Sequence, residues 1–146
     1  MIQRLKKLLE SYREQVLYLI FGVLTTAVDW GISFLLYRLW IDAAQAPDSM
    51  VHLADVIAWM AAVAFAFVTN RIWVFGSKKH GFLPVAKELM SFAGGRVFTL
   101  LLQEAIMALF VTWLGWNKYV FRILAAVFVV ILNYVISKLF VFRKTK

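Results

Sequence analysis

The six residues from Asn70 to Phe75 read Asn-Arg-Ile-Trp-Val-Phe, and they end a long apolar run where a short basic run begins. The pattern returns near the C-terminus, where the residues from Ser137 to Phe142 read Ser-Lys-Leu-Phe-Val-Phe. A cation followed by an aromatic ring suits a membrane–water boundary, because the ring lies among the lipid head groups and the cation reaches them. These two signature segments therefore predict two halves of the chain, each ending at a membrane surface.

The composition is that of an integral membrane protein. The chain has 146 residues, of which 63% are hydrophobic, and its mean hydropathy is +0.79. A soluble domain is about 45–50% apolar, and a small one buries only part of its surface. The net charge of +8 does not indicate a nucleic-acid partner, since the cations cluster beside the apolar runs. The absence of cysteine excludes disulfides, thiol catalysis and thiolate metal sites.

Four apolar runs are long enough to cross about 30 Å of hydrocarbon as helices. They cover residues 16–37, 51–75, 89–114 and 119–142. Residues 1–15 have apolar side chains at helical spacing, which predicts an amphipathic helix on the cytoplasmic surface; a solvated basic tail fits them as well. A cleavable signal peptide is the rival interpretation of the first run, but the run is longer than a signal sequence needs. We therefore expect an all-α protein with a single membrane domain over residues 1–146.

The distribution of cations predicts the orientation. They gather in the N-terminal tail, the second connection and the C-terminal tail, at Arg4, Lys6, Lys7, Arg13, Lys78, Lys79, Lys87, Arg143, Lys144 and Lys146. Because cytoplasmic segments carry the excess of Lys and Arg, both termini should be cytoplasmic. Each half would then cross the membrane out and back. The two halves would form two parallel two-helix repeats about an axis along the membrane normal.

Several motifs occur in a fixed order along the chain. They are Phe21-Gly22 with Thr25 and Asp29, the segment Asn70–Phe75, Arg96 with Glu104, and the segment Asn133–Phe142. Together they resemble the GtrA-like family of small four-span membrane proteins, over about residues 15–143. The family pattern often places an Asn one turn before the small polar residue, as Asn133 precedes Ser137; the corresponding position in the second span holds Ala66.

The resemblance implies a multi-pass protein of the bacterial cytoplasmic membrane that serves cell-surface polysaccharide or cell-wall glycan synthesis. Members of the family are associated with flipping a polyprenyl-phosphate-linked monosaccharide, or with acting beside the glycosyltransferase that makes it. The expected partners are therefore this sugar lipid, the surrounding membrane lipids and a glycosyltransferase. The resemblance implies no cofactor, and the sequence contains no nucleotide-binding glycine loop.

Charged residues inside the spans are the candidate binding residues, because each costs about 2.5–3.5 kcal/mol at mid-bilayer. At about 1.5 Å per residue, Arg96 lies about 10 Å along the third span and Glu104 about 20 Å. The lipid phosphate would be bound by Arg96, Arg71 and Lys138, since the guanidinium group donates two parallel hydrogen bonds to phosphate.

The sugar hydroxyls would be met along a polar track formed by Asp29, Glu104, Asn133 and Asn70. The simpler alternative is that Arg96 only pairs with Asp29 or Glu104 in order to be buried, while Arg71 and Lys138 anchor the spans at the head groups. Asp55 is interpreted as interfacial. Five aromatic residues near the predicted interfaces are interpreted as a membrane belt, not as sugar-stacking platforms: Trp40, Trp73, Trp113, Trp116 and Phe140.

Three functions are compatible with the sequence. A flippase is favoured; a non-catalytic scaffold for a glycosyltransferase and a small cation or drug exporter are the alternatives. An enzyme is not expected, because the sequence shows neither a nucleophile–base pair nor a metal cluster, and His52 and His80 stand alone. Four spans leave little room for a shielded polar path, so we expect a homo-oligomer, in particular a homodimer.

Overall fold

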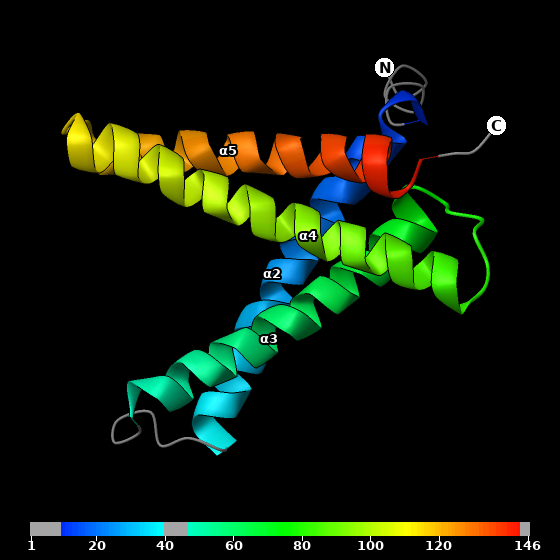
Figure 1. The fold of residues 1–146 in the computed structure, drawn as a ribbon, viewed down its shortest axis with the longest axis horizontal. Coiled ribbons are helices and arrows are strands. Elements are labelled where there is room, and N and C mark those ends of the chain that lie inside the picture. Colours follow the sequence, from blue (N-terminus) through cyan, green and yellow to red (C-terminus); the bar gives the residue numbers. More distant parts are fainter. Residues whose placement is uncertain (1–9, 40–46, 144–146) are drawn as a thin grey trace, which may run out of the picture. The chain divides into compact units, whose positions relative to one another are not determined.

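The structure is a computed structural model that describes residues 10–39 and 47–143. In this part of the chain there are helices and no strands (Figure 1), and the α-helices are α2 (Arg13–Leu39), α3 (Asp48–Thr69), α4 (Phe82–Met107) and α5 (Lys118–Ile136). Three of them continue into short π-helical segments, η1 (Asn70–Val74), η2 (Ala108–Trp113) and η3 (Ser137–Val141). The all-α fold class is therefore confirmed.

Among the described residues four helical segments are long and apolar enough to span a membrane, as the sequence predicts. They are Arg13–Leu39, Asp48–Val74, Phe82–Trp113 and Lys118–Val141. The third begins at Phe82, seven residues before the predicted residue 89. The reason is that Pro84 lies in the first helical turn, where a missing N–H is tolerated and the fixed φ suits a helix. Of the predicted surface helix at 1–15, residues 1–9 lie outside the described part.

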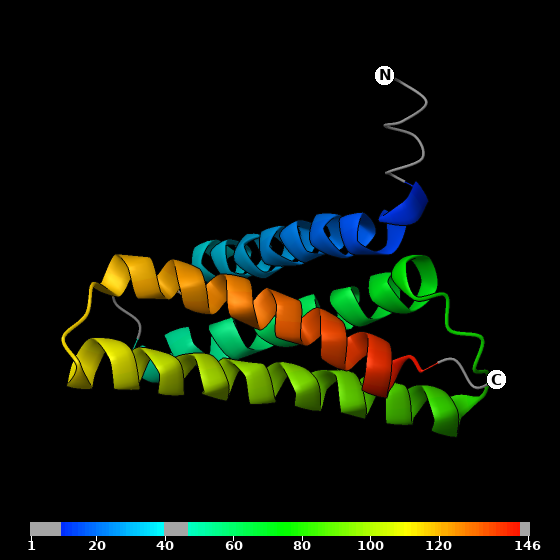
Figure 2. The ribbon, with the colours of Figure 1, turned by 90° about the horizontal axis from the view of Figure 1, so that it is seen from above.

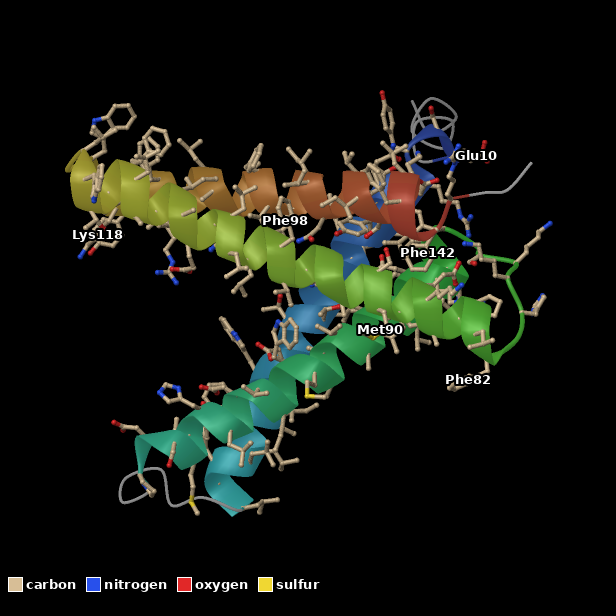
Figure 3. All side chains as sticks on the ribbon, in the orientation of Figure 1. Glu10, Phe82, Met90, Phe98, Lys118 and Phe142 are labelled. Atoms are coloured by element: carbon tan, nitrogen blue, oxygen red, sulfur yellow. The ribbon has the colours of Figure 1, made fainter. Side chains whose placement is uncertain are left out.

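The chain divides into two compact units after Gly76, directly behind the first signature segment. The first unit contains α2 and α3, and the second contains α4 and α5. Figures 1 and 2 show that the two helices of each unit run antiparallel to one another. In the second unit, Phe82 and Phe142 lie at one end of the helix pair and Lys118 at the other (Figure 3).

Small residues allow the helices of each unit to approach closely. On α3, residues spaced four apart form a ridge that is buried along its whole length: Ala54, Ala58, Ala62 and Ala66. In the second unit, a Cβ atom added at Gly95 would lie 3.0 Å from Cγ2 of Ile136 on α5. Because lipid tails are as apolar as the helices, close van der Waals packing of this kind is what associates helices in a membrane.

The two signature segments adopt the same local structure. The backbone N–H of Phe75 donates to the carbonyl of Asn70, and that of Phe142 donates to the carbonyl of Ser137, both at 2.8 Å. The buried Phe75 ring then lies 6.3 Å from the Tyr18 ring of α2. In the second unit the buried Phe142 ring lies 5.9 Å from Phe92 of α4. Each signature thus ends its unit by packing its last ring against the unit's first helix.

Large apolar side chains are exposed on all four helices. One of them is Phe98 of α4 (Figure 3). A water-soluble monomer rarely exposes contiguous apolar surface on this scale, so the solvent of these side chains is lipid. Trp73 and Phe140, which occupy the aromatic position of the two signature segments, are 50% and 73% exposed.

Candidate functional site

Arg96 lies near the middle of the membrane-length segment formed by α4 and η2. It follows the helix start at Phe82 by fourteen residues, which places it about 21 Å along the helix, since α4 begins earlier than expected. The side chain is half-buried, and its Cζ atom lies 5.3 Å from the centroid of the Phe92 ring. Because Phe92 is itself packed against Phe142, a core ring supports the guanidinium group through a cation–π contact.

A buried threonine links the two helices of the second unit beside Arg96. The Thr99 side chain is 1% exposed. Its hydroxyl oxygen lies 2.8 Å from Oδ1 of Asn133 on α5 and 3.0 Å from the backbone carbonyl oxygen of Arg96. The structure thus brings the side chain of one predicted site residue, Asn133, to a hydroxyl one turn from the backbone of another, Arg96. Sequence reasoning missed Thr99, although its position three residues after Arg96 puts both on one helix face.

The other predicted site residues of the second unit lie farther along their helices. Lys138 is exposed in η3, and its ammonium group donates to the Tyr134 hydroxyl at 3.1 Å while lying 5.4 Å from the centre of that ring. Glu104 is exposed two turns beyond Arg96, about 12 Å along α4. The Arg96–Thr99–Asn133 cluster is therefore the polar centre of this unit.

In the first unit, Asn70 occupies the junction of α3 and η1 and is 1% exposed. Its Nδ2 atom donates to the Ala66 carbonyl at 2.7 Å, and the neighbouring Thr69 hydroxyl donates to the Phe65 carbonyl at 2.9 Å. Within residues 10–39 and 47–143, no group forms a hydrogen bond with Oδ1 of Asn70. A buried acceptor without a partner is costly, so this oxygen is suited to accept a hydrogen bond from a ligand.

Asp29 lies in a pocket between α2 and α3, which we call the α2–α3 pocket. It has a volume of about 460 Å³ and is lined by Asp29, Trp30, Ser33, Phe34, Tyr37, Asp55 and Trp59. The Tyr37 hydroxyl donates to Oδ1 of Asp55. Sequence analysis interpreted Asp55 as interfacial and did not consider Trp30, Tyr37 or Trp59. The available signal was the spacing of four residues between Asp29, Ser33 and Tyr37, which puts them on one face of a helix.

Glu88 of α4 is a buried carboxylate that the sequence analysis did not consider, and its side chain is 2% exposed. It accepts a hydrogen bond from the Ser77 hydroxyl at 2.7 Å, and the Lys79 ammonium group lies 3.5 Å away. Both partners belong to the segment that precedes α4. Since a buried carboxylate must be paired, this contact anchors that segment to α4.

The order of motifs in the chain can now be compared with known proteins. A family model described as the GtrA/DPMS transmembrane domain matches residues 17–142, which include both signature segments. The chain belongs to this family. The resemblance drawn from the motifs is thereby confirmed.

Several relatives match this chain over most of its length. The membrane protein YwcD of Bacillus subtilis strain 168 is 35% identical over 130 residues, covering 89% of this chain and 97% of the relative. Two proteins named "Cell wall teichoic acid glycosylation protein GtcA" match 90% of this chain and 86% of their own length. The one from Listeria innocua is 33% identical, and the one from Listeria monocytogenes serovar 1/2a is 32% identical. No solved structure matches.

The predicted site divides between the two units. Of the three residues predicted to bind phosphate, Arg71 belongs to the first unit, and Arg96 and Lys138 belong to the second. Their joint role stays a prediction. The same holds for the polar track, which takes Asp29 and Asn70 from the first unit and Asn133 and Glu104 from the second. Among the described residues, no group of three or more His, Cys, Asp or Glu side chains could hold a metal ion.

Proposed function

We propose that this chain is a non-catalytic flippase of the bacterial cytoplasmic membrane that carries a polyprenyl-phosphate-linked monosaccharide for cell-surface glycan synthesis. Family membership supports the proposal, and so do the names of the Listeria relatives, which place those proteins in the glycosylation of teichoic acid. A protein with four membrane-length helices in its described part is suited to act on the lipid-linked form of the sugar, which is confined to the membrane.

The observation that carries the proposal is the position of Arg96. It lies within a membrane-length helix, over a core aromatic ring and beside the Thr99–Asn133 contact, where the neighbouring Gly95 approaches Ile136 just before the second signature segment. An ionisable residue inside a membrane-length helix is rare and marks a substrate path in membrane proteins. Arginine also suits phosphate monoesters and diesters, because its planar fork binds two oxygen atoms at once.

The remaining predicted site residues would then bind the rest of the head group. In the proposed cycle the phosphate is bound by Arg96 with Arg71 and Lys138. The sugar hydroxyls are met by Asn133, Asn70, Asp29 and Glu104. The unsatisfied buried oxygen of Asn70 supports this role, since a sugar hydroxyl can donate to it. The polyprenyl chain remains in the lipid beside the apolar outward faces.

We also propose the arrangement in the membrane on which this cycle depends. Both termini are cytoplasmic, as the excess of Lys and Arg in the tails and in the second connection indicates. The two signature segments then end their spans at the inner leaflet, where the sugar lipid is made. A glycosyltransferase is the expected partner on that side.

Translocation by the Arg96→Gln variant tests the function directly. In proteoliposomes containing a fluorescent polyprenyl-phosphate monosaccharide, the variant should translocate at least about tenfold more slowly. A charged hydrogen bond contributes about 1.5–3 kcal/mol, and 1.4 kcal/mol corresponds to a factor of ten. Accessibility of the sugar to an added, membrane-impermeant periodate solution gives the rate. Arg96→Lys should retain part of the activity, because it keeps the charge and loses the fork.

The matched control is Arg122→Gln, which removes an exposed arginine from the same unit and should leave the rate within about twofold. Wild-type protein that moves no sugar lipid would refute the flippase. Capture of a glycosyltransferase by that inactive protein would then favour the scaffold. Equal rates in wild type and Arg96→Gln would refute the role given to Arg96.

A further inference from the structure

The α2–α3 pocket combines aromatic rings with hydrogen-bonding groups in a way that the phosphate site does not explain. Four of its seven lining side chains are aromatic, namely Trp30, Phe34, Tyr37 and Trp59. The other three are Asp29, Ser33 and Asp55. All seven come from α2 and α3, so the first unit forms the whole pocket.

The pocket is large enough for a small organic molecule. Its volume of about 460 Å³ falls in the range of about 300–1,000 Å³ that is typical of sites for small organic molecules. A metal ion occupies far less space, and it needs several ligands that converge on one point. In the described part of the chain, no group of three or more metal-ligating side chains does so.

The lining groups match the two kinds of surface that a monosaccharide presents. The C–H groups on a sugar ring face carry a small positive charge, and they pack against the negative faces of aromatic rings. The hydroxyl groups around the ring edge donate to carboxylates and exchange hydrogen bonds with side-chain hydroxyls. Asp29 and Asp55 provide the carboxylates, and Ser33 provides a hydroxyl. The Tyr37 hydroxyl holds the Asp55 carboxylate in place, which leaves the second carboxylate oxygen for a ligand.

The pocket also lies at the end of the first unit opposite to Asn70 and Arg71. Asp29 follows Phe21 by eight residues, or about 12 Å along α2, and the Phe21 ring stacks on Trp73 of η1 at 5.5 Å. Tyr37 lies two residues before the end of α2 at Leu39. The pocket therefore occupies the far half of the helix pair, away from the signature segment.

We infer that the α2–α3 pocket is a carbohydrate site that receives the sugar of the translocated lipid on the side of the membrane away from the signature segments. The ring stacks on Trp59 or Trp30, and its hydroxyls are bound by Asp29 and Asp55. The ligand class rests on the proposed function, because a lipid-linked sugar is the substrate given there.

Binding of free sugars tests the inference without any transport step. The protein is placed in lipid nanodiscs, because glycoside detergents would compete for the site. Methyl glycosides of glucose, galactose and N-acetylglucosamine are added in turn, and saturation-transfer NMR measures their contact with the protein. At least one of the three should bind, and Trp59→Ala and Asp55→Asn should each weaken its binding at least fivefold. Tyr37→Phe should also weaken it, since it removes the hydroxyl that orients Asp55.

The controls are Trp113→Ala and Asp48→Asn, which change an indole and a carboxylate outside the pocket; both should bind as the wild type does. Circular dichroism shows from the helicity which variants fold. If Trp59→Ala does not fold, the conservative variants Asp55→Asn and Tyr37→Phe still test the site.

The inference would be overturned if no glycoside bound to the wild type, or if all pocket variants bound the glycoside equally well. The inference would also be overturned if tetramethylammonium displaced the glycoside at a concentration lower than that of the glycoside. That result would assign the pocket to a cation.

The outcome can be separated from that of the proposed function. Wild type that translocates the sugar lipid while its pocket variants bind glycosides unchanged would refute the carbohydrate site alone. Glycoside binding that depends on Asp55, in a protein that translocates nothing, would refute the flippase alone.

Discussion

The Thr99 hydroxyl is the contact by which the second unit positions its polar centre. A hydroxyl has one proton, and Thr99 lies within hydrogen-bond distance of two oxygen atoms, Oδ1 of Asn133 and the carbonyl oxygen of Arg96. At 1% exposure, water does not reach it. The single proton is donated to one of these oxygens at a time, and donation to Oδ1 of Asn133 links α4 to the side-chain amide on α5.

Replacing Thr99 by Val keeps the shape of the side chain and removes the hydroxyl. We expect Thr99→Val to destabilise the protein by about 1–2 kcal/mol, because the Asn133 amide loses its partner inside the unit. Thermal unfolding in detergent measures the effect. Thr26→Val is the matched control, since the exposed Thr26 hydroxyl bonds only to its own helix, at the Gly22 carbonyl. Equal melting temperatures for the two variants would contradict the role of Thr99.

The helix pair α4–α5 includes a close approach at Gly95. Gly95 faces Ile136, and a Cβ atom there would be 3.0 Å from Cγ2, whereas nothing lies within 4 Å of a Cβ atom at Gly94. The two neighbouring glycines thus have different roles. Gly94 only loosens the helix, because glycine lowers helix propensity, while Gly95 makes room for the partner helix.

Leucine substitutions at these two positions should separate the roles. Gly95→Leu should destabilise the second unit by about 1–3 kcal/mol, since the added side chain overpacks the seam with α5. Gly94→Leu should be neutral or slightly stabilising, because it improves helix propensity without a clash. Thermal unfolding of both variants in the same detergent provides the comparison. A Gly94→Leu variant as unstable as Gly95→Leu would show that the seam lies elsewhere.

At the scale of the whole molecule, each of the two units has a pair of membrane-length helices among the described residues. Many large apolar side chains of these helices are exposed. A polar path for a sugar head group, by contrast, must be shielded from lipid, because unsatisfied polar groups cost several kcal/mol there. A second copy of the chain would provide additional shielding.

We therefore expect a homodimer. Native mass spectrometry of protein released from lipid nanodiscs should give twice the chain mass of 16.8 kDa. Crosslinking in the intact membrane, before any extraction, serves as the control for association in detergent. A single-chain mass from nanodiscs, together with no crosslinked pair in membranes, would rule the dimer out.

Much of the fold could be predicted because hydropathy and helix length are properties of short stretches of chain. The four spans follow from them, and the signature segments mark where two spans end. The start of α4 could not be placed, since Pro84 is compatible both with a connection and with a first helical turn. Arg96 was found as a charge inside an apolar run, whereas Thr99 was not, because a threonine in a helix carries no such signal.

Composition and residue order were enough to establish the class of protein, the membrane-length helices and the family. The contacts of Thr99 with Asn133, of Glu88 with the segment before α4, and of Tyr37 with Asp55 became known from the folded structure. Tyr37 and Asp55 are 18 residues apart, and Thr99 and Asn133 are 34 apart. The physical reason is that such pairs depend on the register between two antiparallel helices, which side-chain packing along the seam sets and no local pattern encodes.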